Sequence, residues 1–368
     1  MKLLPLDEVK KGMVLKESVY SSLDSIVPIV AKDTIITPRI LGKLREQGIR
    51  EVKVATAGEE GHEPPRFYVP KPKPVIQEKL RKEAIDSLEE FFLMAGEKEG
   101  TSKEPTQVIK HMENVVEQLV DSITQDKDAL VNISDLKSYD EYTYHHSLGV
   151  AVLCIAMGQT IGFSRAEMYE LGKCAIMHDI GKTAIPIEII NKPGRLDVKE
   201  FDTIKRHPAE GYYYLTDRNV TNEIISQGVL FHHEKVDGTG YPFGLKGAEI
   251  PLLSRIISVA DVYDALTSNR PYRDPMQPFE AVEYIMAGIG SAFDYDTVAA
   301  FIKKMELYPV GSFVRLSNDE IGCIVKNENP LRPVVQLVQT GEILDLYRDR
   351  NCLSLTVKKI IPAEEFGL

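Results

Sequence analysis

The histidines of this chain are crowded into one stretch, and this crowding constrains the fold more than any other feature of the sequence. Six of the eight histidines in 368 residues lie between His145 and His233. They fall at or near the ends of apolar segments with helical periodicity, and carboxylates accompany several of them. Their spacings are too wide for a zinc finger. The pattern therefore predicts that the ends of separate helices bring these side chains together.

Five successive helical elements each present imidazole or carboxylate groups. In chain order these groups are His145 and His146, then His178 and Asp179, then His207, then His232 and His233, and finally Asp261 and Asp264. Pro208 disfavours helical geometry at the residue before it, which predicts that the third helix, residues 198–206, ends at His207. Imidazole and carboxylate ligands without a thiolate favour iron, manganese or zinc, and so many ligands suit two or three ions.

The segments that flank this array predict smaller domains. Residues 1–70 combine short apolar alternations with one helical stretch, which indicates an α+β accessory domain. Prolines between Pro64 and Pro74 indicate a stiff linker, and two amphipathic helices follow it, so residues 71–130 form a linker with bridging helices. Residues 131–307 hold the ligand array, and residues 308–368 contain short β-like runs. The predicted class is mainly α, a helical bundle with a small N-terminal α+β domain and a short C-terminal β appendage.

Composition limits the partners and the cellular compartment that we expect for this chain. The formal net charge of −11 argues against a nucleic-acid polymer as partner. There is no apolar run of about 18 residues, so we expect no membrane span. The acidic pair Asp7-Glu8 stands where a signal peptide would continue its apolar core, which argues against export. Four scattered cysteines without a CxxC motif suit a reducing compartment, so we expect a cytoplasmic protein.

Two motifs within the array carry a family resemblance. The first is His178-Asp179-Ile180-Gly181-Lys182, and the second is the longer string HHEKVDGTGYP at residues 232–242. The order of these motifs is similar to the HD superfamily of metal-dependent phosphohydrolases, and the second string resembles the HD-GYP family in particular. The resemblance covers residues 136–305. It implies an HD-type helical bundle with a bi- or trinuclear metal centre that hydrolyses the second messenger cyclic di-GMP to linear pGpG, GMP or both.

The resemblance also implies a set of metal ligands. Carried over position by position, the ligands are His146, His178, Asp179, His207, His232, His233 and Asp261, with Glu141 added in a three-metal subgroup. Asp179 is the natural bridge, because its carboxylate offers one oxygen to each of two ions. His145 stays open as an alternative to His146, since Glu141 and His145 are four residues apart and share a helix face. Two or three divalent ions are expected, with iron favoured and manganese or zinc as alternatives.

The implied chemistry needs no covalent nucleophile from the protein. A hydroxide that bridges two ions would attack the phosphate in line, and Lys182 would neutralise charge on the phosphate oxygens. Asp179 or a metal-bound water would manage the proton. Arg270 and Arg273 could each bind a phosphate through two hydrogen bonds. The ring of Tyr241 or Tyr272 could stack on a guanine. The segment Asp237–Pro242, here called the GYP loop, is a turn that shapes the rim of the site and is a candidate contact for protein partners.

Three functions therefore remain open from the sequence. The first is a phosphodiesterase that acts on cyclic di-GMP. The second is an HD hydrolase with another nucleotide or phosphoester substrate. The third is a non-enzymatic sensor that binds cyclic di-GMP or metal without turnover. The sequence leaves open the metal, the final product, the signal received by the N-terminal domain and the oligomeric state, including a homodimer.

Overall fold

The computed structural model describes residues 2–20, 28–32, 34–55, 74–96, 105–125, 130–132, 136, 142–192, 194–269 and 274–361. It divides the chain into two compact units. One unit is the helical bundle Pro74–Met305, and the other combines Met1–Lys73 with Glu306–Leu368. The mainly α class, with small sheets contributed by the two ends of the chain, confirms the predicted fold class.

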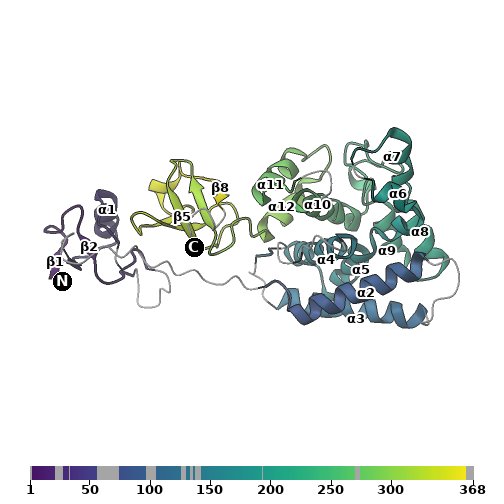
Figure 1. Ribbon diagram of the computed structural model, residues 1–368, viewed down its shortest axis with the longest axis horizontal. Helices are drawn as coiled ribbons and strands as arrows, with labels where there is room; N and C mark the ends of the chain where they lie inside the picture. Colours follow the sequence, from purple (N-terminus) through teal and green to yellow (C-terminus); the bar gives the residue numbers. More distant parts are fainter. Residues whose placement is uncertain are drawn as a thin grey trace. The chain divides into compact units, whose positions relative to one another are not determined.

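The bundle begins with two long helices that precede most of the site residues. Helix α2 (Glu78–Gly96) and helix α3 (Pro105–Thr124) pack side by side, and both contact α4 (Tyr142–Ile161), as Figure 1 shows. Helix α4 is buried almost completely from residue 148 to residue 157, because α5 (Arg165–Met177), α10 (Leu252–Thr267) and α12 (Tyr295–Lys304) also pack against it. An all-round apolar sequence is what such a central helix requires.

The remaining elements of the bundle are shorter and link the long helices. They are the 3-10 helix η2 (Ile180–Ala184), α6 (Ile187–Ile190), α7 (Val198–Ile204), α8 (His207–Asp217), α9 (Glu223–Leu230), the 3-10 helix η3 (Gly247–Glu249) and α11 (Pro278–Ala287). Local caps define several starts. Ser164 and Glu167 form a capping box at α5, and Asp197 and Glu200 form another at α7. Asn222 caps α9 by accepting a hydrogen bond from the N–H of Ile225.

One predicted helix boundary is wrong. Helix α7 already ends at Ile204, and His207 is the first residue of α8, with Pro208 next to it in the first helical turn. Proline is tolerated there, because the first N–H groups of a helix have no intrahelical partner. His207 therefore opens a helix, whereas the sequence pattern predicted that it would close one.

In its described residues, the second unit contains two antiparallel sheets and one α-helix. Strands β1 (Lys2–Pro5), β3 (Glu51–Ala55) and β2 (Val14–Leu15) form the first sheet in that order, and α1 (Pro38–Glu46) starts at the N-cap Thr37. The second sheet has the order β7-β6-β5-β4-β8. Its elements are β4 (Phe313–Leu316), β5 (Ile321–Lys326), β6 (Val334–Leu337), β7 (Ile343–Asp345), the 3-10 helix η4 (Arg350–Cys352) and β8 (Val357–Ile361).

The two ends of the chain make direct contacts within this unit. Val30 forms an isolated bridge with Glu342, and the Thr34 hydroxyl donates a hydrogen bond of 3.1 Å to the carbonyl of Gly341. The Lys43 ammonium donates a second one of 2.8 Å to the carbonyl of Ile343. Residues 1–70 and 308–368, which the sequence predicts as separate segments, thus share one compact unit.

Candidate metal centre

His178 and Asp179 lie in the short connection between two helices. Helix α5 ends at Met177, His178 follows in helical conformation, and Asp179 precedes η2. Both side chains are almost completely buried. The tight 3-10 turn brings η2 against α8, and Gly181 makes this approach possible. A Cβ atom at position 181 would lie only 2.0 Å from the carbonyl oxygen of His207. The glycine of this motif therefore sets the distance between Asp179 and His207.

Three of the histidines are oriented by the same kind of local hydrogen bond. In each, the ring Nδ1 lies within hydrogen-bond distance of the backbone carbonyl three residues earlier, at the end of the preceding helix or helical turn. The pairs are His178 with Ala175 at 2.7 Å, His207 with Ile204 at 2.8 Å, and His232 with Val229 at 2.6 Å. A carbonyl only accepts, so Nδ1 carries the proton and Nε2 keeps the lone pair. Such a hydrogen bond fixes the tautomer that metal-binding histidines use.

The first group of candidate ligands consists of His146, His178 and Asp179. One potential ligand atom from each lies within 4.8 Å of the others. The Nε2 atoms of His146 and His178 are 3.6 Å and 3.4 Å from Oδ2 of Asp179. Asp261 from α10 joins this group, because its Oδ1 is 3.2 Å from Nε2 of His146. Residues from α4, the end of α5 and α10 therefore converge on one point.

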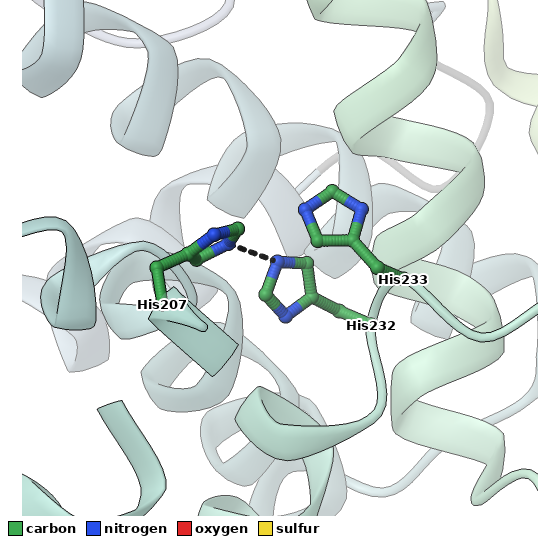
Figure 2. A group of neighbouring side chains, drawn as sticks. All are labelled: His207, His232 and His233. Atoms are coloured by element: carbon green, nitrogen blue, oxygen red, sulfur yellow. Dashed lines mark hydrogen bonds between the residues drawn. The ribbon is translucent and has the colours of Figure 1, made fainter. Parts of the chain in front are cut away.

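The second group consists of His207, His232 and His233. Figure 2 shows their three rings converging, with His207 at the start of α8 and the adjacent pair just after α9. The Nε2 atoms of His207 and His232 are 3.3 Å apart. Nδ1 of His233 is 3.9 Å from Oδ2 of Asp261. Three imidazoles with partners at this spacing are a typical ligand set for a divalent transition metal.

Asp179 lies between the two groups. Its Oδ2 faces His146 and His178, whereas its Oδ1 is 3.3 Å from Nε2 of His207. The Lys182 ammonium, 30% exposed, donates a hydrogen bond of 2.5 Å to Oδ2. Burial favours a neutral carboxyl, but Lys182 and the neighbouring imidazoles outweigh it and hold the pKa of Asp179 well below its usual range. The side chain is therefore ionised and presents one oxygen to each group.

One buried atom in the centre has no hydrogen-bond partner among the residues that the structure describes. Nε2 of His178 is completely buried, and its approach to Asp179 lacks hydrogen-bond geometry. A buried polar atom without a partner costs roughly 1–3 kcal/mol. A metal ion accepting the Nε2 lone pair would remove this cost. The donor set and this orphaned nitrogen therefore fit a divalent metal.

The protonation states differ between the two groups. Burial lowers the pKa of His207 to about 3 and that of His233 to about 4, and it lowers the pKa of His232 well below its usual range. The second group is therefore neutral at pH 7, as metal binding requires. Burial also opposes a charge on His146, but hydrogen bonds to Asp261 and Asp264 outweigh it and raise its pKa to about 9.

Asp264 is a site residue whose role the sequence did not reveal. Its Oδ2 lies 2.6 Å from Nδ1 of His146, which leaves Nε2 of that ring directed toward Asp179 and Asp261. His145 faces elsewhere, because its Nδ1 is 2.7 Å from the carbonyl of Leu136. The geometry thus brings His146 and not His145 to the centre. The spacing of one helical turn between Asp261 and Asp264 was the available signal, since both lie on one face of α10.

The GYP loop folds back onto the segment that precedes it. The N–H of Tyr241 donates a hydrogen bond of 3.2 Å to the carbonyl of His233, and the two side-chain rings stack with centroids 4.7 Å apart. A Cβ at Gly240 would lie 2.3 Å from the backbone nitrogen of Lys235, so only glycine fits. Tyr241 is thereby held at the edge of the second group. Glu141, Arg270, Tyr272 and Arg273 lie outside the described residues.

Fold and site together define a helical-bundle protein with two largely buried histidine-rich groups that share an aspartate. The chain belongs to the HD domain family, whose model matches residues 110–297. The cyclic di-GMP phosphodiesterase PA4108 of Pseudomonas aeruginosa is 40% identical over 216 residues, which are 59% of this chain and 52% of that protein. The 3'3'-cGAMP-specific phosphodiesterase 3 of Vibrio cholerae is 37% identical over 49% of this chain and 39% of that protein.

A solved structure has the same fold. Bd1817, described as a HDG"Y"P protein from Bdellovibrio bacteriovorus, superposes with a TM-score of 0.51 over 82% of this chain and 97% of its own. Its sequence identity of 16% limits the likeness to the fold. The chain spans about half the length, or less, of the two curated relatives. Among the described helices, none is long and apolar enough to cross a bilayer.

Proposed function

We propose that this chain is a metal-dependent phosphodiesterase that hydrolyses cyclic di-GMP to linear pGpG, GMP or both. The observation that carries the proposal is the pair of histidine groups joined by the two oxygens of Asp179. A phosphodiester needs its charge neutralised and a water activated, and a two-metal site supplies both. The relative from Pseudomonas aeruginosa, named for this substrate, supports the choice of cyclic di-GMP.

The proposed ligands follow the two groups. His146, His178, Asp179 and Asp261 would hold one ion, and His207, His232 and His233 would hold another with Asp179 shared between them. Iron is our first choice, with manganese or zinc as alternatives. Glu141 would add a third ion. Divalent ions bound there would lower the pKa of a water molecule and polarise the phosphate.

The chain's own residues would orient and neutralise the substrate. Lys182 is partly exposed beside Asp179, and we expect its ammonium to bind a phosphate oxygen as well as the carboxylate. The lowered pKa of Asp179 suits a metal ligand and makes it a poor proton acceptor at neutral pH. Arg270 and Arg273 would bind the phosphates, and Tyr241 or Tyr272 would stack on a guanine. The four scattered cysteines without a CxxC motif support a cytoplasmic location.

The test uses protein purified without oxygen and loaded separately with iron, manganese or zinc. Each form is incubated with cyclic di-GMP, and the nucleotides are separated by chromatography. We expect linear product with at least one metal, and no product with any of the three would refute the proposal. Asp179→Asn should abolish turnover. His111→Gln is the control, because His111 lies on α3, beside Glu83 and away from the candidate ligands. This variant should be as active as the wild type.

A second substrate is favoured by one comparison. The relative from Vibrio cholerae is named as specific for 3'3'-cGAMP, which differs from cyclic di-GMP in one base. Equal concentrations of the two dinucleotides in one reaction will rank them by kcat/KM. Preferential loss of cyclic di-GMP supports the proposal, whereas preferential loss of 3'3'-cGAMP supports this alternative. Binding without loss of either nucleotide would indicate a sensor.

A further inference from the structure

Glu234 is a buried carboxylate whose two oxygens both serve the backbone. Glu234 follows His233 directly in the sequence, and it is only 2% exposed. Oε1 accepts hydrogen bonds from the N–H groups of Phe243 at 2.7 Å and Gly244 at 3.1 Å, and Oε2 accepts one from Leu245 at 3.0 Å. Three consecutive N–H groups thus surround one carboxylate. Hydrogen bonds to an ionised acceptor are about twice as strong as neutral ones.

These three N–H groups follow the GYP loop, so Glu234 ties the end of the loop to its beginning. Only Lys235 and Val236 separate Glu234 from the start of the loop, and Phe243 is the first residue after Pro242. The Phe243 ring meets the Phe231 ring edge-on with centroids 5.9 Å apart, which adds an apolar contact at the same place. Removal of the carboxylate would leave three N–H groups without this acceptor and would free the chain on the C-terminal side of Tyr241.

Tyr241 is the residue whose position depends on this tie. Its ring stacks on the His233 ring at an angle of 29°, and it is partly exposed. Two hydrogen bonds hold the residue in place. Its own N–H donates to the His233 carbonyl, and the N–H of Phe243, two residues further on, donates to the Glu234 carboxylate. An aromatic ring fixed beside a phosphate-binding centre is a suitable platform for a nucleobase, because every base offers a π-face for stacking.

We propose that Glu234 is a positioning residue that sets Tyr241 for base stacking at the rim of the centre. The inference rests on the proposed function, since it assumes a nucleotide substrate. Glu234 acts on substrate binding through the loop backbone, and the metal ligands do not depend on it. A glutamate that only supported the fold would change stability without separating KM from kcat.

The first experiment measures amide hydrogen exchange and needs no substrate. Glu234→Gln keeps the size of the side chain but replaces one acceptor oxygen with an NH2 group that faces an N–H. We expect exchange at residues 243–245 to be about tenfold faster or more, as the loss of a charged hydrogen bond implies. Glu249→Gln is the matched control, because exposed Glu249 accepts the N–H of Lys246 at 2.8 Å in the following turn. It should affect exchange only at Lys246.

The second experiment measures kinetics with cyclic di-GMP and the metal content of each variant. We expect Glu234→Gln to raise KM about tenfold, with kcat within about twofold of the wild type and bound metal unchanged. Tyr241→Ala should raise KM by a similar factor while leaving Glu234 intact. The double variant should be no worse than Tyr241→Ala alone, because both changes remove the same interaction. Glu249→Gln should leave KM unchanged.

Specific results would overturn the inference. Wild-type exchange at residues 243–245 in Glu234→Gln would show that the carboxylate does not hold the loop. Loss of metal, or a fall in kcat at constant KM, would show that Glu234 acts through His233. Additive effects in the double variant would separate Glu234 from Tyr241. If the wild type neither binds nor cleaves cyclic di-GMP, the proposed function fails, and the exchange experiment alone then decides whether Glu234 holds the loop.

Discussion

Replacement of Gly181 by alanine should separate the two ligand groups. A Cβ at this position would lie 2.0 Å from the carbonyl oxygen of His207 and 2.4 Å from the backbone nitrogen of Gly211. Ordinary contacts begin near 3.4 Å, so η2 and α8 must move apart by about 1.4 Å. Both obstacles are backbone atoms, which a side-chain rotation cannot clear. Overpacking of this kind typically costs about 1–3 kcal/mol, and we expect a value near the upper end.

The same movement carries Asp179 away from His207. Their closest atoms are 3.3 Å apart, and a shift of about 1.4 Å removes Oδ1 of Asp179 from the second group. A misplacement of about 1 Å in a catalytic site can cost a hundredfold in rate. We therefore expect Gly181→Ala to lose metal from the His207, His232 and His233 group and to retain at most about 1% of wild-type kcat/KM.

Urea unfolding followed by circular dichroism and metal analysis of the purified protein will measure both effects. Gly96→Ala is the matched control in the same bundle. Among the described residues, its Cβ would meet only the Cβ of Thr183, at 4.0 Å, so stability and metal content should stay within error of the wild type. If Gly181→Ala unfolds at the wild-type urea concentration and keeps its full metal content, the close approach of η2 and α8 does not hold the groups together.

Four further outcomes are expected. Asp179→Asn should remove metal from both groups, and a loss confined to one group, measured by metal analysis, would contradict a shared carboxylate. Asp264→Asn should weaken metal binding about 10- to 100-fold in titrations, because the neutral amide oxygen is a weaker acceptor for His146 than the carboxylate; unchanged affinity would refute that role. Metal-stripped protein should lose stability as pH falls from about 6.5 to 4, since His207 and His233 stay neutral in the fold but are protonated when unfolded. His146, with its pKa raised to about 9, should cause a second loss as pH rises from about 6.5 to 9. Thermal melting across this range will test both signs, and a flat profile would contradict them.

Local sequence patterns predict much of the architecture. Helix starts follow from short-range caps such as Ser164 with Glu167, and the buried α4 follows from its all-round apolar composition. The GYP loop follows from glycine and proline in one short string. These features depend on residues a few positions apart, so a single sequence specifies them. The same reasoning misplaced the end of α7, because proline both ends helices and begins them.

The sequence by itself determined which side chains are available for the centre, their chemistry and their order along the chain. Only the tertiary structure decided how they are grouped. It directs His146 inward and His145 toward Leu136, and it turns the two oxygens of Asp179 to different groups. The physical reason is that these distances join residues tens of positions apart. Helix packing sets such distances, and the close approach at Gly181 is one contact that no periodicity along the chain could specify.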